Sequence, residues 1–461
     1  MSAAASALSL GRELAAICGE AHVSENPVAL EGFAIDGVVP AVAVEPASAE
    51  EVAAILRMAT ARDLVVVPSG GFTQQAGGGV PTRVDILLRT SRMRSVRYYD
   101  PGDLTFGAEA GITIHEIDQR LAEKAQWLPL DVVRPESATL GGVLATAAHG
   151  PLKHAFGGVR EFCIGVSFVT GDGTLAKGGG RVVKNVAGYD LMKLLIGSQG
   201  TLAVIVEANF KVFPRPRQTR TFVDEFAELD EAMRFRDRVL RSPLKPLCVD
   251  LVSPRAAEYL TETPPRVRDV EEVTPQHPTE PALGPWQVMV RAAGSDSVLA
   301  RYRRELGADA AHELAGMDET RAWRCIAGFA ENVLARHQNA MMLDLNLPIA
   351  SVRDALAAAE RAGLENNFLC AVVGRAGVGS LVVTFIPLLV DPPSAMQYAN
   401  AVSNLRGGLP RDASAVVTRC PREAKLHFSL WGTPPTDLEC MRAVKRALDP
   451  RNVLNRGRFV V

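Results

Sequence analysis

Residues 67–79 read VPSGGFTQQAGGG, a glycine-rich loop that follows a short β-branched run at residues 64–67. Glycines let a chain turn inward without a Cβ in the way, so several backbone N–H groups can converge on one phosphate. The hydroxyls of Ser69 and Thr73 add two donors. The loop is neither a Walker A sequence nor a Gly-x-Gly-x-x-Gly fingerprint. Taken alone, it fits a diphosphate site and a plain glycine-rich turn equally well.

Helices and strands are expected to alternate around this loop. Residues 48–62 predict a helix, because Ser48 is a suitable N-cap, Glu50 and Glu51 favour the positive helix end, and apolar residues recur at helical spacing. A loop at a strand's end is where α/β proteins bind ligands. Further strands are expected at 104–110, 162–170 and 202–212, and a helix at 114–125.

Two more segments are rich in small residues. Residues 135–150 read PESATLGGVLATAAHG, which would let a flat ring or a diphosphate lie against the backbone. The alternative is a tightly packed helix crossing. Residues 184–191 read KNVAGYDL and residues 197–202 read GSQGTL, so glycines bracket a helix that leads into a strand.

In this order and spacing, the three segments resemble the FAD-binding domain of the vanillyl-alcohol-oxidase-type (PCMH-type) FAD-linked oxidases. The sequence VVKNVAGYD at 182–190 is especially similar to the FAD-binding subunits of bacterial glycolate oxidases. The ending LDPRNVLNRGRF at 448–459 resembles the family's C-terminal signature, in which the tail returns to the flavin domain. The resemblance is strong over 40–217 and 431–461 and weak between them.

The resemblance implies an α+β fold with a two-subdomain, PCMH-type FAD-binding domain at 1–217. An α+β cap domain with an antiparallel sheet is expected at 218–430, and a C-terminal segment that packs on the FAD domain at 431–461. Within the cap, six prolines between 264 and 285 predict an exposed loop. Cap strands are expected at 287–291 and 381–386, and helices at 297–306, 352–362 and 394–406.

The family's cofactor contacts can be carried over position by position. The backbone of Ile205 is expected to recognise the adenine. Gly197 and Gly200 are expected to let the chain come close to the cofactor there. Covalent family members attach the flavin to a histidine or cysteine in or near these loops. Phe72 and its neighbours offer neither, so we expect non-covalent FAD. The residues expected to line the diphosphate and flavin are Ser69, Gly70, Gly71, Phe72, Thr73, Gln74, Thr139, Gly141, Gly142 and Thr146.

Many 2-hydroxyacid dehydrogenases of this family carry a His-x-Gly-Asp-Gly-Asn-x-His element that supplies metal ligands and a base. This sequence lacks it, as does the FAD-binding subunit of glycolate oxidase, so we expect no metal site. The histidines after residue 217 are isolated. His427 precedes the C-terminal signature and is the candidate base; the alternative is a structural histidine.

The implied activity is that of the FAD-binding subunit of a glycolate or 2-hydroxyacid dehydrogenase, which passes hydride from a small hydroxyacid to flavin N5. The seven cysteines include no Cys-x-x-Cys pair. The resemblance therefore implies an iron–sulfur subunit and a second flavin subunit as partners. One alternative is a self-sufficient oxidase or dehydrogenase of another hydroxyl substrate. Another is a non-catalytic subunit that binds FAD for assembly.

Composition excludes several other classes. The chain has 461 residues, 47% of them hydrophobic, and a net charge of −2, which is typical of a two-domain globular protein without a basic field for nucleic acid. No apolar run reaches the roughly 20 residues that span a bilayer. Residues 1–10 lack a basic n-region. We therefore expect a cytoplasmic protein that reaches the inner membrane only through partners.

Overall fold

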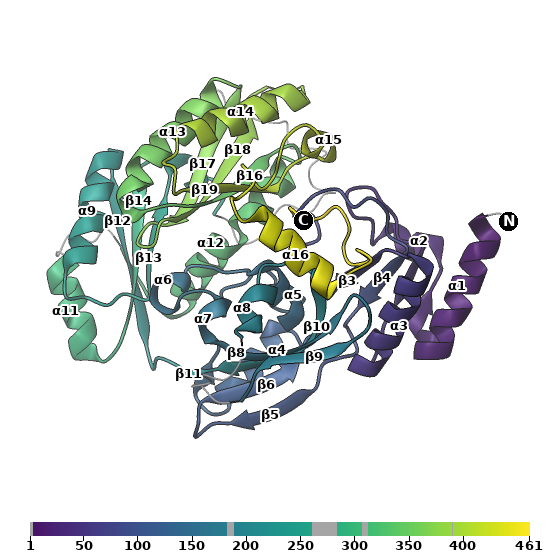
Figure 1. The fold of residues 1–461 in the computed structure, drawn as a ribbon. Helices are drawn as coiled ribbons and strands as arrows, with labels where there is room; N and C mark the ends of the chain where they lie inside the picture. The colour runs from purple at the N-terminus through teal and green to yellow at the C-terminus, as the bar shows by residue number, and fades with distance from the viewer. Residues whose placement is uncertain (1–2, 182–188, 261–283, 307–311, 390) are drawn as a thin grey trace. The chain divides into compact units, whose positions relative to one another are not determined.

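The computed structural model describes residues 3–181, 189–260, 284–306, 312–389 and 391–461 (Figure 1). Contacts divide the chain into two compact units. The first comprises Met1–His149, Gly158–Arg215 and Pro434–Val461, and the second comprises Gly150–Gly157 and Pro216–Thr433. The expected domains, 1–217, 218–430 and 431–461, stay a prediction. Chain order does not reveal that Gly150–Gly157 packs within the second unit.

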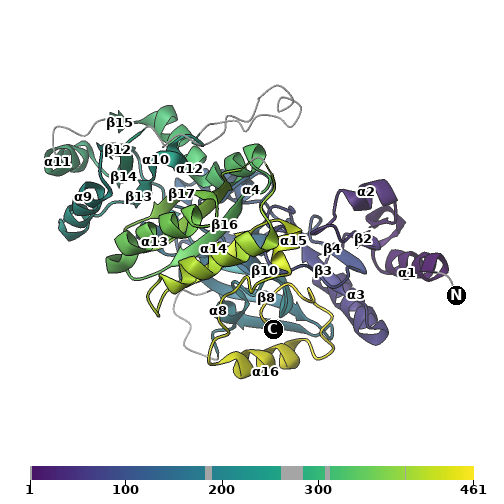
Figure 2. The ribbon, with the colours of Figure 1, turned by 90° about the horizontal axis from the view of Figure 1, so that it is seen from above.

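The first unit begins with a four-stranded sheet in the order β1-β2-β4-β3. Figure 2 labels β2, β3 and β4 of this sheet. The predicted helix at 48–62 is α3 (Ala49–Arg62), and the Ser48 side chain caps it by accepting the Glu51 N–H. The apolar face of α3 and helix α1 (Ala3–Cys18) share one hydrophobic cluster with the sheet. The strands are β1 (Val23–Ser24), β2 (Val42–Val44), β3 (Val66–Ser69) and β4 (Ile86–Arg89), with the short helix α2 (Pro27–Glu31) after β1.

A five-stranded antiparallel sheet, β5-β6-β10-β8-β9, forms the rest of the first unit's framework. The expected strands at 104–110, 162–170 and 202–212 are confirmed as β6, β8 and β10. The strands are β5 (Val96–Asp100), β6 (Thr105–Glu109), β8 (Cys163–Thr170), β9 (Leu175–Gly179) and β10 (Ala203–Lys211), and the pair β7 (Gln126–Trp127) and β11 (Phe213–Pro214) stands apart. The helices are α4 (Ile114–Ala122), α5 (Leu140–Thr146), α7 (Val159–Phe162) and α8 (Leu191–Leu195).

The C-terminal segment returns to the first unit, as the resemblance implied. Leu454 forms a parallel bridge with Val66 of β3, and the Val66 N–H donates to the Val453 carbonyl. Helix α16 (Leu438–Leu448) supplies Lys445, whose buried Nζ lies 2.6 Å from an Asp449 carboxylate oxygen and donates to the Thr201 carbonyl. Burial lowers the pKa of Lys445, and the Asp449 carboxylate opposes that shift.

The second unit contains an eight-stranded antiparallel sheet in the order β15-β12-β14-β13-β17-β18-β16-β19. The expected cap strands and helices are all present. One sheet face packs with helices α9, α11, α13 and α14 in the largest core cluster. The strands are β12 (Thr219–Phe226), β13 (Cys248–Val252), β14 (Trp286–Ala293), β15 (His312–Leu314), β16 (Met341–Asn346), β17 (Phe368–Arg375), β18 (Ser380–Pro387) and β19 (Ser414–Arg419). The helices are α6 (Lys153–Phe156), α9 (Leu229–Arg241), α10 (Pro254–Ala257), α11 (Asp296–Leu306), α12 (Gly316–Arg336), α13 (Val352–Leu364), α14 (Ala395–Gly407) and α15 (Arg422–Lys425).

Two sequence features fall outside the described residues. They are positions 182–188 of the VVKNVAGYD motif and most of the proline-rich stretch, up to residue 283. Among the helices that the structure describes, none combines the length and the hydropathy needed to cross a bilayer.

Candidate functional site

A hollow of about 730 Å³, including its solvent-open part, lies in the first unit where the three small-residue segments meet. All the residues expected to contact FAD line it except Gly197. Gly197 lies just outside and donates its N–H to the Leu144 carbonyl. The lining comprises Pro68 to Gln75, Thr90, Thr139, Gly141, Gly142, Ala145, Thr146, Gln199, Gly200, Ala203, Val204, Ile205, Asn455 and Arg458.

The first loop leaves β3 at Ser69 and lies tightly against the second segment. A Cβ on Gly70 would collide with Thr139 Oγ1, and one on Gly71 would collide with the Ser137 carbonyl oxygen. Only glycine permits this approach. Phe72 has left-handed backbone with φ of 62° and packs edge-on against Phe33, with ring centroids 5.5 Å apart. At Gly70 and Gly71 the loop therefore presents only backbone to the hollow.

The second segment forms the start of α5. Thr139 is the N-cap, and its side chain accepts the Gly142 N–H at 3.4 Å. A Cβ on Gly141 would come within 2.9 Å of the Ala110 Cβ, so the helix packs closely on the end of β6. Thr146 Oγ1 donates to the Gly142 carbonyl at 2.8 Å, which fixes that hydroxyl against its own helix.

The third segment enters β10 through a turn with left-handed backbone at Gln199 and Gly200, where φ is 56° and 66°. Ile205 is buried. The pairing of β10 with β8 is irregular between Ile205 and Glu207, and β6 pairs with β10 only from Glu207 onward. Ile205 therefore lies where the regular ladder is interrupted, at the wall of the hollow.

Two buried oxygen atoms in the lining fit a polar cofactor. Ser69 Oγ and Asn455 Oδ1 have no hydrogen-bond partner within the described part of the chain. Leaving such a group unsatisfied costs about 1–3 kcal/mol. FAD carries hydroxyl, amino and imide donors along its length, and Ser69 can also donate to its phosphates. Ser69 and Asn455 are therefore suited to hold it.

The C-terminal segment contributes Asn455 and Arg458 to the lining, two residues that were not among the expected cofactor contacts. Arg458 is almost fully buried and donates to the carbonyls of Gln75 at 2.6 Å and Gly79 at 2.9 Å. It also lies 3.5 Å from a carboxylate oxygen of Asp36. These contacts fix both ends of the second half of the glycine-rich loop. In the sequence, the only indication for Asn455 and Arg458 was that both lie within the C-terminal signature.

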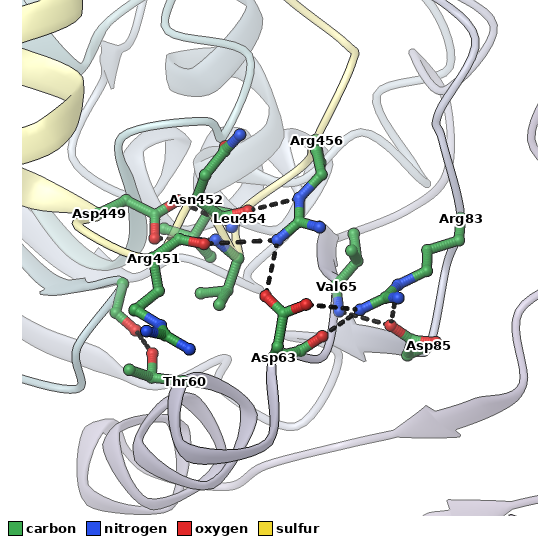
Figure 3. Close-up of polar contacts among 12 residues, drawn as sticks. Thr60, Asp63, Val65, Arg83, Asp85, Asp449, Arg451, Asn452, Leu454 and Arg456 are labelled. Atoms are coloured by element: carbon green, nitrogen blue, oxygen red, sulfur yellow. Dashed lines mark hydrogen bonds and ion pairs between the residues drawn. The ribbon is translucent and has the colours of Figure 1, made fainter.

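Arg456, two residues earlier, makes a separate and more exposed contact (Figure 3). Its Nη2 lies 3.1 Å from Asp63 Oδ1, and its Nε donates to the Asn452 carbonyl. The hydrogen bond from Arg456 is the main cause that lowers the pKa of Asp63. Asp63 follows α3 and does not line the hollow, so Arg456 attaches the tail without touching the candidate cofactor site.

The predicted base lies elsewhere. His427 follows α15 in the second unit, and its side chain is exposed. Its role in catalysis stays a prediction. The described lining of the hollow includes neither histidine nor cysteine. Within the described ranges, no three His, Cys, Asp or Glu side chains come together as a metal site.

The chain matches two known protein families. Residues 40–179 match the FAD binding domain, and residues 215–403 and 425–459 match the C-terminal domain of FAD linked oxidases. The chain therefore belongs to the FAD-linked oxidases with a PCMH-type FAD-binding domain. It is an FAD-linked oxidoreductase whose homologues include hydroxyacid dehydrogenases.

Several relatives match along nearly their whole length. The D-lactate dehydrogenase of Archaeoglobus fulgidus is 28% identical over 91% of this chain and 91% of its own. The D-2-hydroxyglutarate dehydrogenase of Xanthomonas citri pathovar viticola is 26% identical over 90% and 88%. The glycolate oxidase subunit GlcD of Bacillus subtilis is 22% identical over 91% and 89%. The structure of 4-ethylphenol oxidase from Gulosibacter chungangensis shares the fold, with a TM-score of 0.74, 14% identity and coverage of 99% and 97%.

Proposed function

We propose that this chain is the FAD-binding subunit of a dehydrogenase that oxidises a small 2-hydroxyacid of the glycolate or D-lactate type. The observation that carries the proposal is the similarity to relatives over 88–91% of their own lengths. Lactate, 2-hydroxyglutarate and glycolate share one chemical unit, a carboxylate beside a carbon that bears a hydroxyl group. Bound FAD supplies the hydride acceptor for that carbon.

The residues of the first unit suit the task of holding the cofactor. We assign the diphosphate to the loop from Ser69 to Gln74 and the second segment at Thr139 to Thr146, because these backbones meet at one hollow. Asn455 Oδ1, which has no hydrogen-bond partner among the described residues, can accept from a hydroxyl, amino or imide donor elsewhere on FAD. Arg458 fixes the loop through the carbonyls of Gln75 and Gly79, so that the loop is ordered before FAD arrives.

We further propose that reduced cofactor is reoxidised through partners, an iron–sulfur subunit and a second flavin subunit. Support comes from the relative that is itself named as a subunit of glycolate oxidase. The cysteines of this chain are dispersed, so cluster ligands would come from another chain. Such a complex would place this chain in the cytoplasm, at the inner membrane only through its partners.

The test is an absorbance spectrum of the FAD-loaded protein, recorded before and after anaerobic addition of glycolate, D-lactate and D-2-hydroxyglutarate. The isolated chain and the complex purified from the native host are compared. Bleaching of the flavin bands by one of these acids supports the proposal. Bands that persist in both preparations, yet bleach with dithionite, contradict it. Rapid oxygen consumption by the isolated chain would instead favour a self-sufficient oxidase.

A further inference from the structure

The outward face of helix α9 in the second unit carries a line of arginine side chains. The opposite face of α9 is buried in the core of that unit. Arg234, Arg238 and Arg241 are spaced by four and three residues, so they lie along one face of the helix, and all three are exposed. We call these three residues the arginine stripe. Lys245, which follows four residues after Arg241, is exposed as well.

This end of α9 concentrates positive charge in a chain that is not basic as a whole. Residues 234–245 contain five arginine or lysine residues and one acidic residue, whereas the net charge of the chain is −2. The acidic residue, Asp237, is already engaged, because the buried Arg236 donates to Asp237 Oδ1 from Nε at 2.9 Å and from Nη2 at 2.6 Å. The arginine stripe is therefore left with a surplus of positive charge.

The outer two arginines of the stripe have only loose partners on their own helix. Arg241 Nη2 lies 3.9 Å from Asp237 Oδ2, and Arg234 Nη2 lies 4.0 Å from Glu231 Oε1. Charge-assisted hydrogen bonds between such groups measure about 2.7–2.9 Å. The side chains of Arg234 and Arg241 are 72% and 83% exposed, so these long ion pairs contribute little to stability. Both guanidinium groups can therefore exchange them for an incoming carboxylate.

A surface depression of about 800 Å³, including its solvent-open part, lies along the arginine stripe. Its lining consists of Arg234, Asp237, Arg238, Arg241 and Ser242. Arg238, in the middle of the stripe, lies over the ring of Phe235, with its guanidinium carbon 4.9 Å from the ring centroid. That contact fixes the central guanidinium in place. Three arginines thus border one depression, which a protruding carboxylate side chain can enter.

Resting on the proposed function, which includes partner subunits, we propose that the arginine stripe and Lys245 form the docking surface for an acidic segment of a partner subunit. Arginine is enriched at protein interfaces, and its planar fork pairs with both oxygens of a carboxylate. Complementary charge of this kind steers two proteins together and fixes their register. An anionic membrane fits less well, because interfacial helices also insert large apolar side chains, and none of the residues of α9, all of them described, is an exposed large hydrophobic.

The first experiment maps the contact in the complex purified from the native host. A water-soluble carbodiimide joins the amine of a lysine, as an amide, to a carboxylate that touches it. We expect Lys245 to be joined to an aspartate or glutamate of a partner subunit, identified by peptide mass spectrometry. Lys245→Arg keeps the charge and is the control, so the partner subunit should be retained while this cross-link disappears. Cross-links to the partner from other lysines, with none from Lys245, overturn the inference.

The second experiment measures the affinity of the FAD-loaded chain for that purified partner subunit. The dissociation constant is determined at about 0.1 M and about 1 M salt, between which the Debye length falls from about 10 Å to about 3 Å. Arg234→Glu combined with Arg241→Glu should weaken binding about tenfold or more at the lower salt, and much less at the higher. The matched control combines Arg361→Glu with Arg411→Glu, two exposed arginines of the second unit outside α9, and should bind like the wild type. Unchanged FAD content and thermal unfolding show that both double variants are folded.

Each result decides for or against the docking surface. Weaker binding in the α9 double variant, but not in the control, supports it. Equal affinity in the two double variants, or an affinity that salt does not change, overturns it, and so does loss of binding to vesicles of phosphatidylcholine and phosphatidylglycerol without any loss of partner binding. A chain that purifies alone, with a flavin that a hydroxyacid bleaches, overturns the docking surface and keeps the dehydrogenase. Docking through the stripe in a protein whose flavin no hydroxyacid bleaches keeps the docking surface and rejects the proposed function.

Discussion

Arg458 donates a hydrogen bond of 2.6 Å to the backbone carbonyl of Gln75, although 383 residues separate the two in the chain. Its second terminal nitrogen donates to the Gly79 carbonyl at 2.9 Å. One side chain of the C-terminal tail therefore fixes the glycine-rich loop to which we assign the FAD diphosphate. The loop contains four glycines between 70 and 78 and would otherwise lose much conformational freedom on binding.

Arg458→Met is expected to weaken FAD binding about tenfold or more, because two buried charge-assisted hydrogen bonds to the loop are lost. The measurement is the dissociation constant of FAD, followed by flavin fluorescence in apoprotein titrations. Arg456→Met is the matched control. It removes the partly exposed contact with Asp63 in the same tail and should change the constant by less than about twofold. Equal losses in the two variants would show that the tail acts only through general stability.

Gly70→Ala tests the contact between the first two segments. The new Cβ would collide with Thr139 Oγ1, the side chain that caps α5, so the loop and the helix start must separate. We expect the purified variant to retain less than about a tenth of the wild-type FAD at equal free FAD, a loss of roughly 1.4 kcal/mol or more. The flavin-to-protein absorbance ratio measures it.

Gly328→Ala is the control for that substitution. Gly328 lies within α12, and an added Cβ there meets nothing within 4 Å. Alanine is favoured over glycine inside a helix by about 0.5–1 kcal/mol, so this variant should be slightly more stable and keep its FAD. Normal FAD content in Gly70→Ala would mean that the loop can move without disturbing the site.

The three segments that form the hollow were recognisable in the sequence because each is a local, glycine-rich run at the end of a strand or the start of a helix. Asn455 and Arg458 were not assigned, because only the parallel bridge between Leu454 and Val66 brings the tail to the loop. No local pattern encodes such a distant contact. The packing of Gly150–Gly157 in the second unit is hidden for a related reason, since this segment directly follows the second loop in sequence.

Helix ends were predicted less well than helix positions. Residues 114–125 were expected to be helical, whereas α4 ends at Ala122. Ala125 adopts left-handed backbone with φ of 52°, and the chain then pairs Trp127 of β7 with Phe213 of β11. The pairing of β7 with a strand almost ninety residues later overrides the helical propensity of the last turn. A pattern of local hydrophobicity carries no information about that partner.

Non-covalent attachment of FAD is the next prediction. The described lining of the hollow contains neither histidine nor cysteine, the residue types expected to form a covalent flavin bond. Acid precipitation should therefore leave the pellet colourless and release all flavin into the supernatant, measured by absorbance. Flavin that stays with the washed, unfolded pellet would contradict the prediction, and peptide mapping of the pellet would then identify the attached residue.

The role of His427 can be separated from cofactor binding. If His427 is the base, His427→Gln should slow anaerobic flavin reduction by the hydroxyacid about 100-fold or more while FAD content stays unchanged. His312→Gln is the matched control, because His312 is also an exposed histidine of the second unit. Equal rates in the two variants would remove His427 from the chemistry.

Asp224 provides a prediction about stability and pH. It lies on β12, is 8% exposed, and its Oδ2 has no hydrogen-bond partner within the described part of the chain. Burial raises the pKa of Asp224 from 3.8 to about 6, against a weaker opposing effect of Arg238. A raised carboxyl pKa means that the folded state holds its proton more tightly than the unfolded chain. The contribution to stability is therefore fully present below about pH 4 and is lost as pH rises through about 6.

Asp224→Asn should remove this dependence. At pH 8 the variant should be more stable than the wild type by roughly 1–3 kcal/mol, since each pKa unit corresponds to about 1.4 kcal/mol. At pH 4 the advantage should disappear. Thermal unfolding of the second unit at both pH values measures the difference, with Asp354→Asn, a carboxylate 77% exposed, as the control. An advantage of Asp224→Asn that is the same at pH 4 and pH 8 would mean that its cause is packing, and that Asp224 does not titrate in this range.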